Sequence, residues 1–293
     1  MIILTLIVVV GWYKGVEAWM LELSQPAVRE LDITGINSSH GILIQARSGK
    51  VLGESGGEER IYPASLTKMM TAIVAIEKLD DLNTEITLSQ EMFAGLYEQD
   101  ATQAGFQPGE TVRAIDLLYG VILPSGAECC IALAEYIAGS EEAFVQMMNE
   151  KAEKLKMDGT HFCDSTGLHD PEHYSTVHDM AILLKYGLKN DTFREIIGSA
   201  RHSTGVTNVH PDGITYYSTL LKNLSDPVVT EGKILGGKTG FTNDAGYCLA
   251  SFAKVGGREY ILVTAGAAQS PMHIQDAITI YNRLGEALQK LKA

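Results

Sequence analysis

The chain is organised around one stretch in its first quarter, which reads Pro63-Ala64-Ser65-Leu66-Thr67-Lys68-Met69-Met70-Thr71. If Ser65 opens a helix, the three-residue spacing places its hydroxyl beside the amine of Lys68. Burial disfavours the charged form of a lysine, and a neutral amine beside a serine hydroxyl can accept its proton. The residues that follow are apolar in nearly every helical direction, which predicts a buried helix. Because S-x-x-K recurs by chance in many proteins, the motif taken alone favours the alternative, a helix-capping Ser65 with a solvated Lys68.

Composition sets the class of protein. The chain has 293 residues, of which 45% are hydrophobic and 20% charged, enough for one large core or two modest lobes. Its net charge of -13, from 23 basic and 36 acidic residues, argues against a nucleic-acid partner. Four cysteines allow three full disulfide pairings, but unpaired, buried cysteines are the favoured state. They are Cys129, Cys130, Cys163 and Cys248.

The sequence predicts neither a metal site nor a cofactor. No C-x-x-C pair occurs, and the adjacent Cys129 and Cys130 are awkward zinc ligands. His169 and His173 are four residues apart, but Pro171 lies between them and disfavours a helix, and there is no H-E-x-x-H motif.

The N-terminal segment differs from the rest of the chain. Residues 2–10 are apolar except for Thr5, and the run is shorter than the roughly 20 residues that span a bilayer. We expect residues 1–30 to be a signal peptide, with cleavage after Ala18, or an N-terminal membrane anchor. A buried N-terminal strand is the alternative. The folded catalytic domain is then residues 31–293.

The remaining pattern predicts an α+β fold with two lobes. A hairpin (41–46 and 51–53) precedes the motif, a β-rich segment (201–217) turns at Pro211-Asp212-Gly213, and two glycines mark a second hairpin near the C-terminus. Strands from both ends should join in one antiparallel sheet covered by terminal helices, with residues 80–200 as a mainly helical lobe. The expected helices are 114–123, 127–138, 141–157 and 273–291, and the expected later strands are 233–242, 247–254 and 258–265.

Three motifs follow one another in order along this pattern: Ser65-x-x-Lys68, Ser125-Gly126-Ala127 and Lys238-Thr239-Gly240. They resemble the S-x-x-K, S-x-N and K-T-G set of penicillin-binding proteins and serine β-lactamases. Residues 62–71, 107–110, 116–120 and 238–242 closely resemble the low-molecular-mass penicillin-binding proteins, which are serine-type D-Ala-D-Ala carboxypeptidases. The resemblance covers about residues 38–290 and implies a β-lactamase/transpeptidase-like fold.

The resemblance also implies roles. Ser65 would attack the penultimate D-Ala carbonyl of a peptidoglycan stem peptide ending in D-Ala-D-Ala, with Lys68 as the acylation base. A nearby second cation, Lys238, would favour the neutral form of Lys68, and Ser125 would relay a proton to the leaving amine.

The resemblance further implies that substrate binding falls to the strand after the second lysine. The backbone N–H groups of Ser65 and Phe241 match the family's oxyanion hole, and hydroxyls and an amine would hold the terminal carboxylate. β-Lactam antibiotics are the expected inhibitors, and the expected location is outside the cytoplasmic membrane. The expected substrate-binding residues are Lys238, Thr239, Gly240, Phe241 and Thr242.

The sequence departs from the family pattern at Ala127, where the family has an asparagine that hydrogen-bonds in the site. Glu128 or an ordered water could replace that amide. Two other functions remain open. A β-lactamase would need a deacylating base such as Glu172, although the loop lacks the E-x-x-L-N pattern, and a catalytically weak sensor or cell-wall binding protein would be consistent with Ala127. Whether the acyl-enzyme passes to water or to an amine stays undecided.

Overall fold

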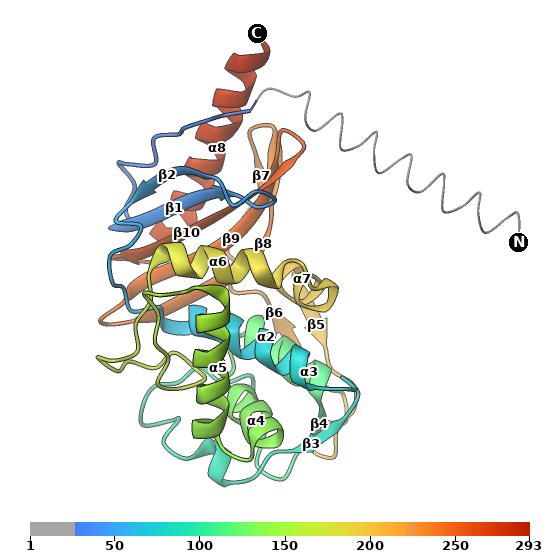
Figure 1. Cartoon of the computed structure of the whole chain (residues 1–293). Helices are drawn as coiled ribbons and strands as arrows, with labels where there is room; N and C mark the ends of the chain where they lie inside the picture. The colour runs from blue at the N-terminus through green and yellow to red at the C-terminus, as the bar shows by residue number, and fades with distance from the viewer. Residues whose placement is uncertain (1–26, 225) are drawn as a thin grey trace, which may run out of the picture.

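A six-stranded antiparallel sheet forms the upper half of the molecule (Figure 1). The computed structural model describes residues 27–224 and 226–293, so the expected signal peptide or anchor lies almost entirely outside the described residues. In the order β2-β1-β10-β9-β8-β7, strands from the two ends of the chain join as expected, with Ile42 opposite Val263. The strands are β1 (His40–Gln45), β2 (Val51–Ser55), β7 (Val228–Val229), β8 (Gly232–Thr242), β9 (Gly246–Val255) and β10 (Arg258–Ala267).

Both faces of the sheet are covered, which explains why β9 and β10 are apolar along most of their length. Helix α8 (Met272–Lys292) packs on one face through its apolar stripe, as its periodicity predicts. Helices α6 (Val177–Gly187) and α7 (Asp191–Gly198) cross the opposite face (Figure 1). The sheet therefore lies between two hydrophobic cores.

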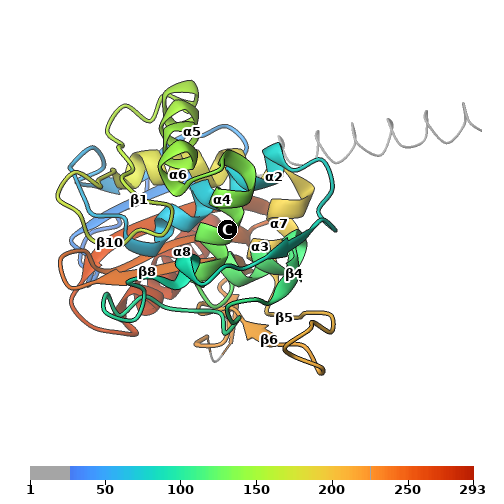
Figure 2. The ribbon, with the colours of Figure 1, turned by 90° about the horizontal axis from the view of Figure 1, so that it is seen from below.

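The core between the sheet and helices α6 and α7 continues into a helical part below the sheet (Figures 1 and 2). Its central helix is α2 (Lys68–Lys78), whose first eight residues are all buried because α4, α3, α5 and α6 surround it. The predicted buried helix after the serine motif is confirmed. The surrounding helices are α3 (Ala114–Ile122), α4 (Ala127–Ala138) and α5 (Glu141–Leu155).

Short strands complete the fold. The expected β structure at 201–217 is present as β5 (Arg201–Ser203) paired with β6 (Thr215–Tyr217). The ladder between β3 (Glu85–Thr87) and β4 (Thr111–Arg113) was not expected, because three-residue strands are too short to show a period of two. A one-turn 3₁₀ helix, η2 (Glu91–Phe93), follows β3.

The four cysteines are free. Cys129, Cys130 and Cys248 are buried as expected, whereas Cys163 is exposed, so the expectation of burial is wrong for that residue. Among the helices of residues 27–224 and 226–293, none has both the length and the apolar composition needed to cross a bilayer.

Candidate active site

Ser65 lies half-buried in a one-turn 3₁₀ helix, η1 (Ala64–Thr67), that leads directly into α2. The turn is tight: Ala64 is buried with φ +47°, a conformation that side chains rarely adopt. Two glycines allow backbones to approach it. A Cβ on Gly167 would lie 1.9 Å from the Ala64 carbonyl oxygen, and one on Gly240 would lie 3.1 Å from the Ser65 nitrogen. The serine is therefore held between the loop 162–168 and strand β8.

Lys68 is the first residue of α2 and is 3% exposed. Its Nζ lies 3.2 Å from the Oγ of Ser65, so the helical spacing brings the two groups together as the sequence predicts. The same amine donates to the carbonyl oxygen of Thr166 at 2.6 Å. That carbonyl belongs to a loop about one hundred residues away in the chain, and it fixes the direction in which the amine points.

Ser125 and Lys238 form the opposite side of the site. Ser125 has φ +74° in the turn between α3 and α4, and the fully buried Nζ of Lys238 donates to its Oγ at 3.0 Å and to the carbonyl oxygen of Thr239 at 2.8 Å. Burial and then the charge of Lys68 hold the pKa of Lys238 well below its usual range. The positive charge on Lys238 is therefore disfavoured in a site that already contains Lys68.

Strand β8 presents an edge to these groups. Gly236–Thr242 pairs with β9 on one side, while β7 pairs only with Gly232 and Lys233 on the other. Among the described residues, no strand pairs with the second edge of residues 236–242, and η1 lies beside it. An extended peptide could therefore add to β8 next to Ser65.

The remaining predicted binding residues of β8 have different surroundings. The hydroxyl of Thr239 lies 2.6 Å from that of Thr219, and the Oγ1 of Thr242 accepts from the backbone N–H of Ala245 at 3.1 Å. Phe241 is 48% exposed, and its ring stacks on Tyr247 at 4.3 Å. The structure therefore assigns the Phe241 side chain to the surface, which leaves its backbone N–H as the group suited to the predicted role.

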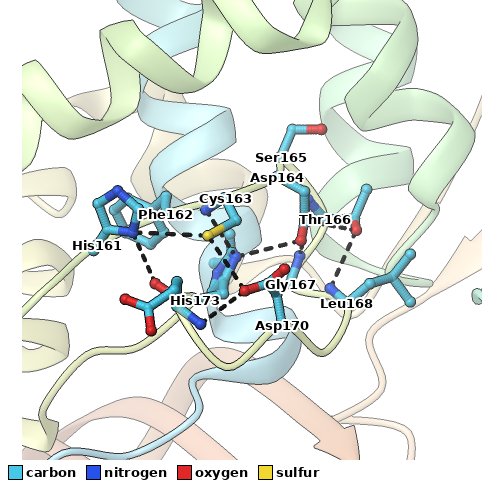
Figure 3. A network of polar contacts seen from close by, with 12 residues as sticks. His161, Phe162, Cys163, Asp164, Ser165, Thr166, Gly167, Leu168, Asp170 and His173 are labelled. Carbon is cyan, nitrogen blue, oxygen red and sulfur yellow. Dashed lines mark hydrogen bonds and ion pairs between the residues drawn. The ribbon is translucent and has the colours of Figure 1, made fainter.

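A polar network fixes the loop that holds Lys68 (Figure 3). One carboxylate oxygen of Asp164 accepts from the backbone N–H groups of Thr166 and Gly167, both at 2.6 Å, and from the Thr166 hydroxyl at 2.8 Å. The other oxygen lies 3.3 Å from Nδ1 of the buried His173, whose Nε2 lies 2.8 Å from Oγ1 of Thr67. The serine motif and the loop are thus joined through one histidine.

The ionisation of Asp164 reflects this network. Burial alone would raise its pKa, but the hydrogen bond and charge of His173, together with hydrogen bonds from Thr166, outweigh burial and lower the pKa to about 2. The carboxylate is therefore ionised at neutral pH.

The loop is also tied to the helices. The hydroxyl of Thr71 in α2 donates to the carbonyl oxygen of Ser165 at 2.6 Å, and Ser165 donates its N–H and hydroxyl to Glu141 of α5. His169 instead lies against the ring of Tyr62 and 3.6 Å from Asp244. The two histidines considered as zinc ligands thus face different partners.

Ala127, at the position of the asparagine in the S-x-N pattern that the sequence resembles, is the first residue of α4 and is buried. Its N–H donates to the carbonyl oxygen of Thr102 at 2.8 Å. The carboxylate of Glu128 accepts from the N–H groups of Ala104 and Gly105, and its other oxygen is buried without a partner among the described residues. Glu128 thus anchors the segment 102–105 over the turn through one of its two carboxylate oxygens.

Sequence reasoning missed Thr166, Asp164, His173 and Thr219. The pattern Asp164-Ser165-Thr166-Gly167 is a sequence signal for an Asx turn, because an aspartate side chain readily accepts from backbone N–H groups two and three residues later. Nothing in the sequence indicated that the turn would present its carbonyl to Lys68.

Comparison with known proteins agrees with this geometry. A family model described as D-alanyl-D-alanine carboxypeptidase matches residues 25–269. D-alanyl-D-alanine carboxypeptidase DacF of Bacillus subtilis is 33% identical over 236 residues, which cover 78% of this chain and 57% of the relative. DacC of Escherichia coli, with the same description, is 33% identical over 249 residues, which cover 82% and 59%. The chain thus spans a little under 60% of the length of these curated relatives.

Solved structures show the same fold. The crystal structure of the Streptomyces K15 DD-transpeptidase matches with a TM-score of 0.77 and 27% identity over 90% of this chain and 99% of that one. D-alanyl-D-alanine carboxypeptidase from Mycobacterium tuberculosis H37Rv also gives 0.77, at 26% identity, over 90% and 96%. The expected transpeptidase-like α+β fold is confirmed. With its serine, two lysines and β8 edge in one place and a family match over most of its length, the chain belongs to the D-alanyl-D-alanine carboxypeptidase family.

Proposed function

We propose that this protein is a serine-type D-Ala-D-Ala carboxypeptidase that removes the terminal D-Ala from peptidoglycan stem peptides through an acyl-enzyme on Ser65. The observation that carries the proposal is the 3.2 Å contact between the Ser65 hydroxyl and the Lys68 amine, in a site that also contains a second buried lysine. A hydroxyl next to an amine that can be neutral is an activated nucleophile.

Acylation begins when the Lys68 amine accepts the proton of Ser65 and Oγ attacks the carbonyl carbon of the penultimate D-Ala. The carbonyl at Thr166 holds the amine toward Oγ. The oxyanion that forms is stabilised by the backbone N–H groups of Ser65 and Phe241, and one such donor contributes about 3 kcal/mol. The close approach of Gly240 to the Ser65 nitrogen supports this pairing of donors.

Collapse of the oxyanion breaks the peptide bond, and the leaving D-Ala amine needs a proton. Ser125 is the relay in this proposal, because its Oγ accepts from Lys238 and so can donate its own proton toward the amine. Lys238, Thr239 and Thr242 would bind the terminal carboxylate, with the peptide lying along the open edge of β8. Water then hydrolyses the acyl-enzyme.

The substrate class implies where the protein acts. We infer a location outside the cytoplasmic membrane, where peptidoglycan lies, with residues 1–30 serving as a signal peptide or membrane anchor. β-Lactam antibiotics would acylate Ser65 as mimics of the D-Ala-D-Ala end.

The test is to incubate a synthetic pentapeptide ending in D-Ala-D-Ala with the wild type and with Ser65→Ala and to follow its mass. We expect loss of one D-Ala with the wild type alone. The matched control makes the same change at an exposed serine: Ser48→Ala, in the β1–β2 turn, should keep full activity. Release of D-Ala by Ser65→Ala at the wild-type rate would refute the assignment. Adding an amine acceptor such as glycylglycine distinguishes hydrolysis from transfer, because transfer gives a heavier product.

The β-lactamase alternative receives no support from the loop 160–175. Glu172 is exposed, its N–H donates to Asp170, and its carbonyl oxygen lies 2.7 Å from the ring of His161. A slow, stable acyl-enzyme with penicillin is therefore the expected outcome, and rapid turnover of penicillin would favour the lactamase.

A further inference from the structure

A basic hollow lies away from the site of Ser65, where the C-terminal end of α6 and helix α7 meet the β1–β2 turn and the β9–β10 turn. Its volume is about 470 Å³. Six of its ten lining residues are Lys or Arg, whereas only 23 of the 293 residues of this acidic chain are. The six are Arg47, Lys185, Lys189, Arg194, Lys254 and Arg258.

The hollow contains far more positive than negative charge. Glu259 is the one acidic residue among those that line it, and both of its oxygens bond to Arg194 at 3.0 Å. The amines of Lys185, Lys189 and Lys254 make no hydrogen bond or ion pair within the part of the chain that the structure describes. Three cations therefore face the hollow without a carboxylate to balance them, a surplus that favours an anionic ligand.

The shape of the hollow is set by the fold. Arg194 is held in place by its two bonds to Glu259 and by donating its Nε to the carbonyl oxygen of Leu188 at 2.9 Å. Arg258 is 6% exposed at the start of β10. The Nζ of Lys185 reaches the β1–β2 turn, where a Cβ on Gly49 would lie 2.4 Å from it. Residues of four separate segments thus direct positive charge to one place.

The hollow is distinct from the catalytic site. Gly240, which contacts Ser65, pairs with Cys248 near one end of β9, and Lys254 lies six residues along the same strand. At the rise of a β-strand this separation is roughly 20 Å. An anion bound in the hollow would therefore not compete with a peptide beside Ser65.

We propose that the basic hollow binds a phosphate-bearing anion. Several cations around one cavity suit the multiple oxygens and full charge of a phosphate group, since charge-assisted hydrogen bonds to lysine and arginine are short and strong. The phosphate could belong to free inorganic phosphate or to the phosphodiester headgroup of an anionic phospholipid, and the two sources share this chemistry.

Calorimetric titration of the whole chain with inorganic phosphate, and separately with glycerophosphoglycerol, the soluble headgroup of phosphatidylglycerol, tests the proposal. Saturable binding to either probe at 50 mM salt is expected, weakening strongly at 500 mM because the contacts are ionic. Tighter binding of the headgroup assigns the site to a phosphodiester, and equal or tighter binding of phosphate assigns it to the free anion.

Lys185→Gln/Lys254→Gln removes two of the surplus charges and should weaken binding at least about tenfold. The matched control is Lys154→Gln/Lys156→Gln, which makes the same charge change on exposed residues at the end of α5 and should bind like the wild type. Equal melting temperatures and equal acylation of Ser65 by a penicillin would show that both variants are folded. Binding of neither probe by the wild type, or equal binding by all three proteins, would overturn the proposal and leave the proposed peptidase function untouched.

Discussion

The change Asp164→Asn removes one negative charge from the loop that holds Lys68, and its effect on stability follows from the ionisation of Asp164. The pKa of this carboxyl falls from 3.8 to about 2 in the folded protein, since hydrogen bonds and the charge of His173 outweigh burial. Linkage between ionisation and folding converts this difference into about 2.5 kcal/mol of stability at neutral pH. Asparagine has the same shape but makes weaker, uncharged hydrogen bonds, so most of this contribution should disappear.

The stabilisation that the Asp164 carboxylate contributes should decrease as the pH falls. Because the pKa is lower in the folded than in the unfolded chain, the stabilisation is complete above about pH 5 and is lost as the pH falls through 2. At pH 3 about half of it should remain, near 1.3 kcal/mol. The difference between wild type and variant should therefore shrink on acidification.

The same change should slow acylation. The Asp164 carboxylate fixes the turn whose carbonyl, at Thr166, holds the Lys68 amine at 2.6 Å. A loosened turn misplaces the amine, and a shift of about 1 Å can cost on the order of a hundredfold in rate. We expect acylation by a fluorescent penicillin to fall by about 10- to 100-fold.

Urea unfolding at pH 7 and pH 3 measures the stability effect, and the penicillin reporter measures the rate. Asp158→Asn, an exposed carboxylate before the same loop, is the matched control and should change neither by much. Two results would refute the electrostatic reasoning. One is that Asp164→Asn lowers the free energy of unfolding by less than about 0.5 kcal/mol at pH 7, and the other is that it lowers it as much at pH 3 as at pH 7.

Three further changes test other parts of the site. Gly167→Ala should lower stability by about 2 kcal/mol or more and the acylation rate by about a hundredfold, because its Cβ would lie 1.9 Å from the Ala64 carbonyl oxygen. The control is Gly35→Ala, which is also at positive φ but has open space around the Cβ. It should lower stability by only about 1 kcal/mol and leave the acylation rate unchanged. Lys238→Met should stabilise the protein by about 1 kcal/mol in urea unfolding, since burial holds the pKa of Lys238 well below its usual range. The same variant should slow penicillin acylation at least about a hundredfold. A destabilised variant would contradict this reasoning. Ala127→Asn should raise the acylation rate by supplying the amide of the S-x-N pattern, and an unchanged or lower rate would show that the packing of residues 102–105 is built for alanine.

Much of the fold could be predicted because it depends on local pattern. The apolar run after Lys68 predicts a buried helix, and the stripe on residues 273–291 predicts a helix lying on a sheet. The spacing of Ser65 and Lys68 also predicts their contact, because a helical turn fixes neighbours three residues apart without help from the rest of the chain.

The tertiary structure alone decided the contacts between segments that are distant in the chain. The family resemblance placed Ser125 and Lys238 in one site, but the contact between them depends on how the turn between α3 and α4 lies beside β8. The Thr166 carbonyl on Lys68, the bridge from Asp164 through His173 to Thr67, and the basic hollow had no local signal. Periodicity along a sequence reports which face of an element is apolar, whereas these contacts arise where elements a hundred residues apart are packed together, and packing assigns their partners.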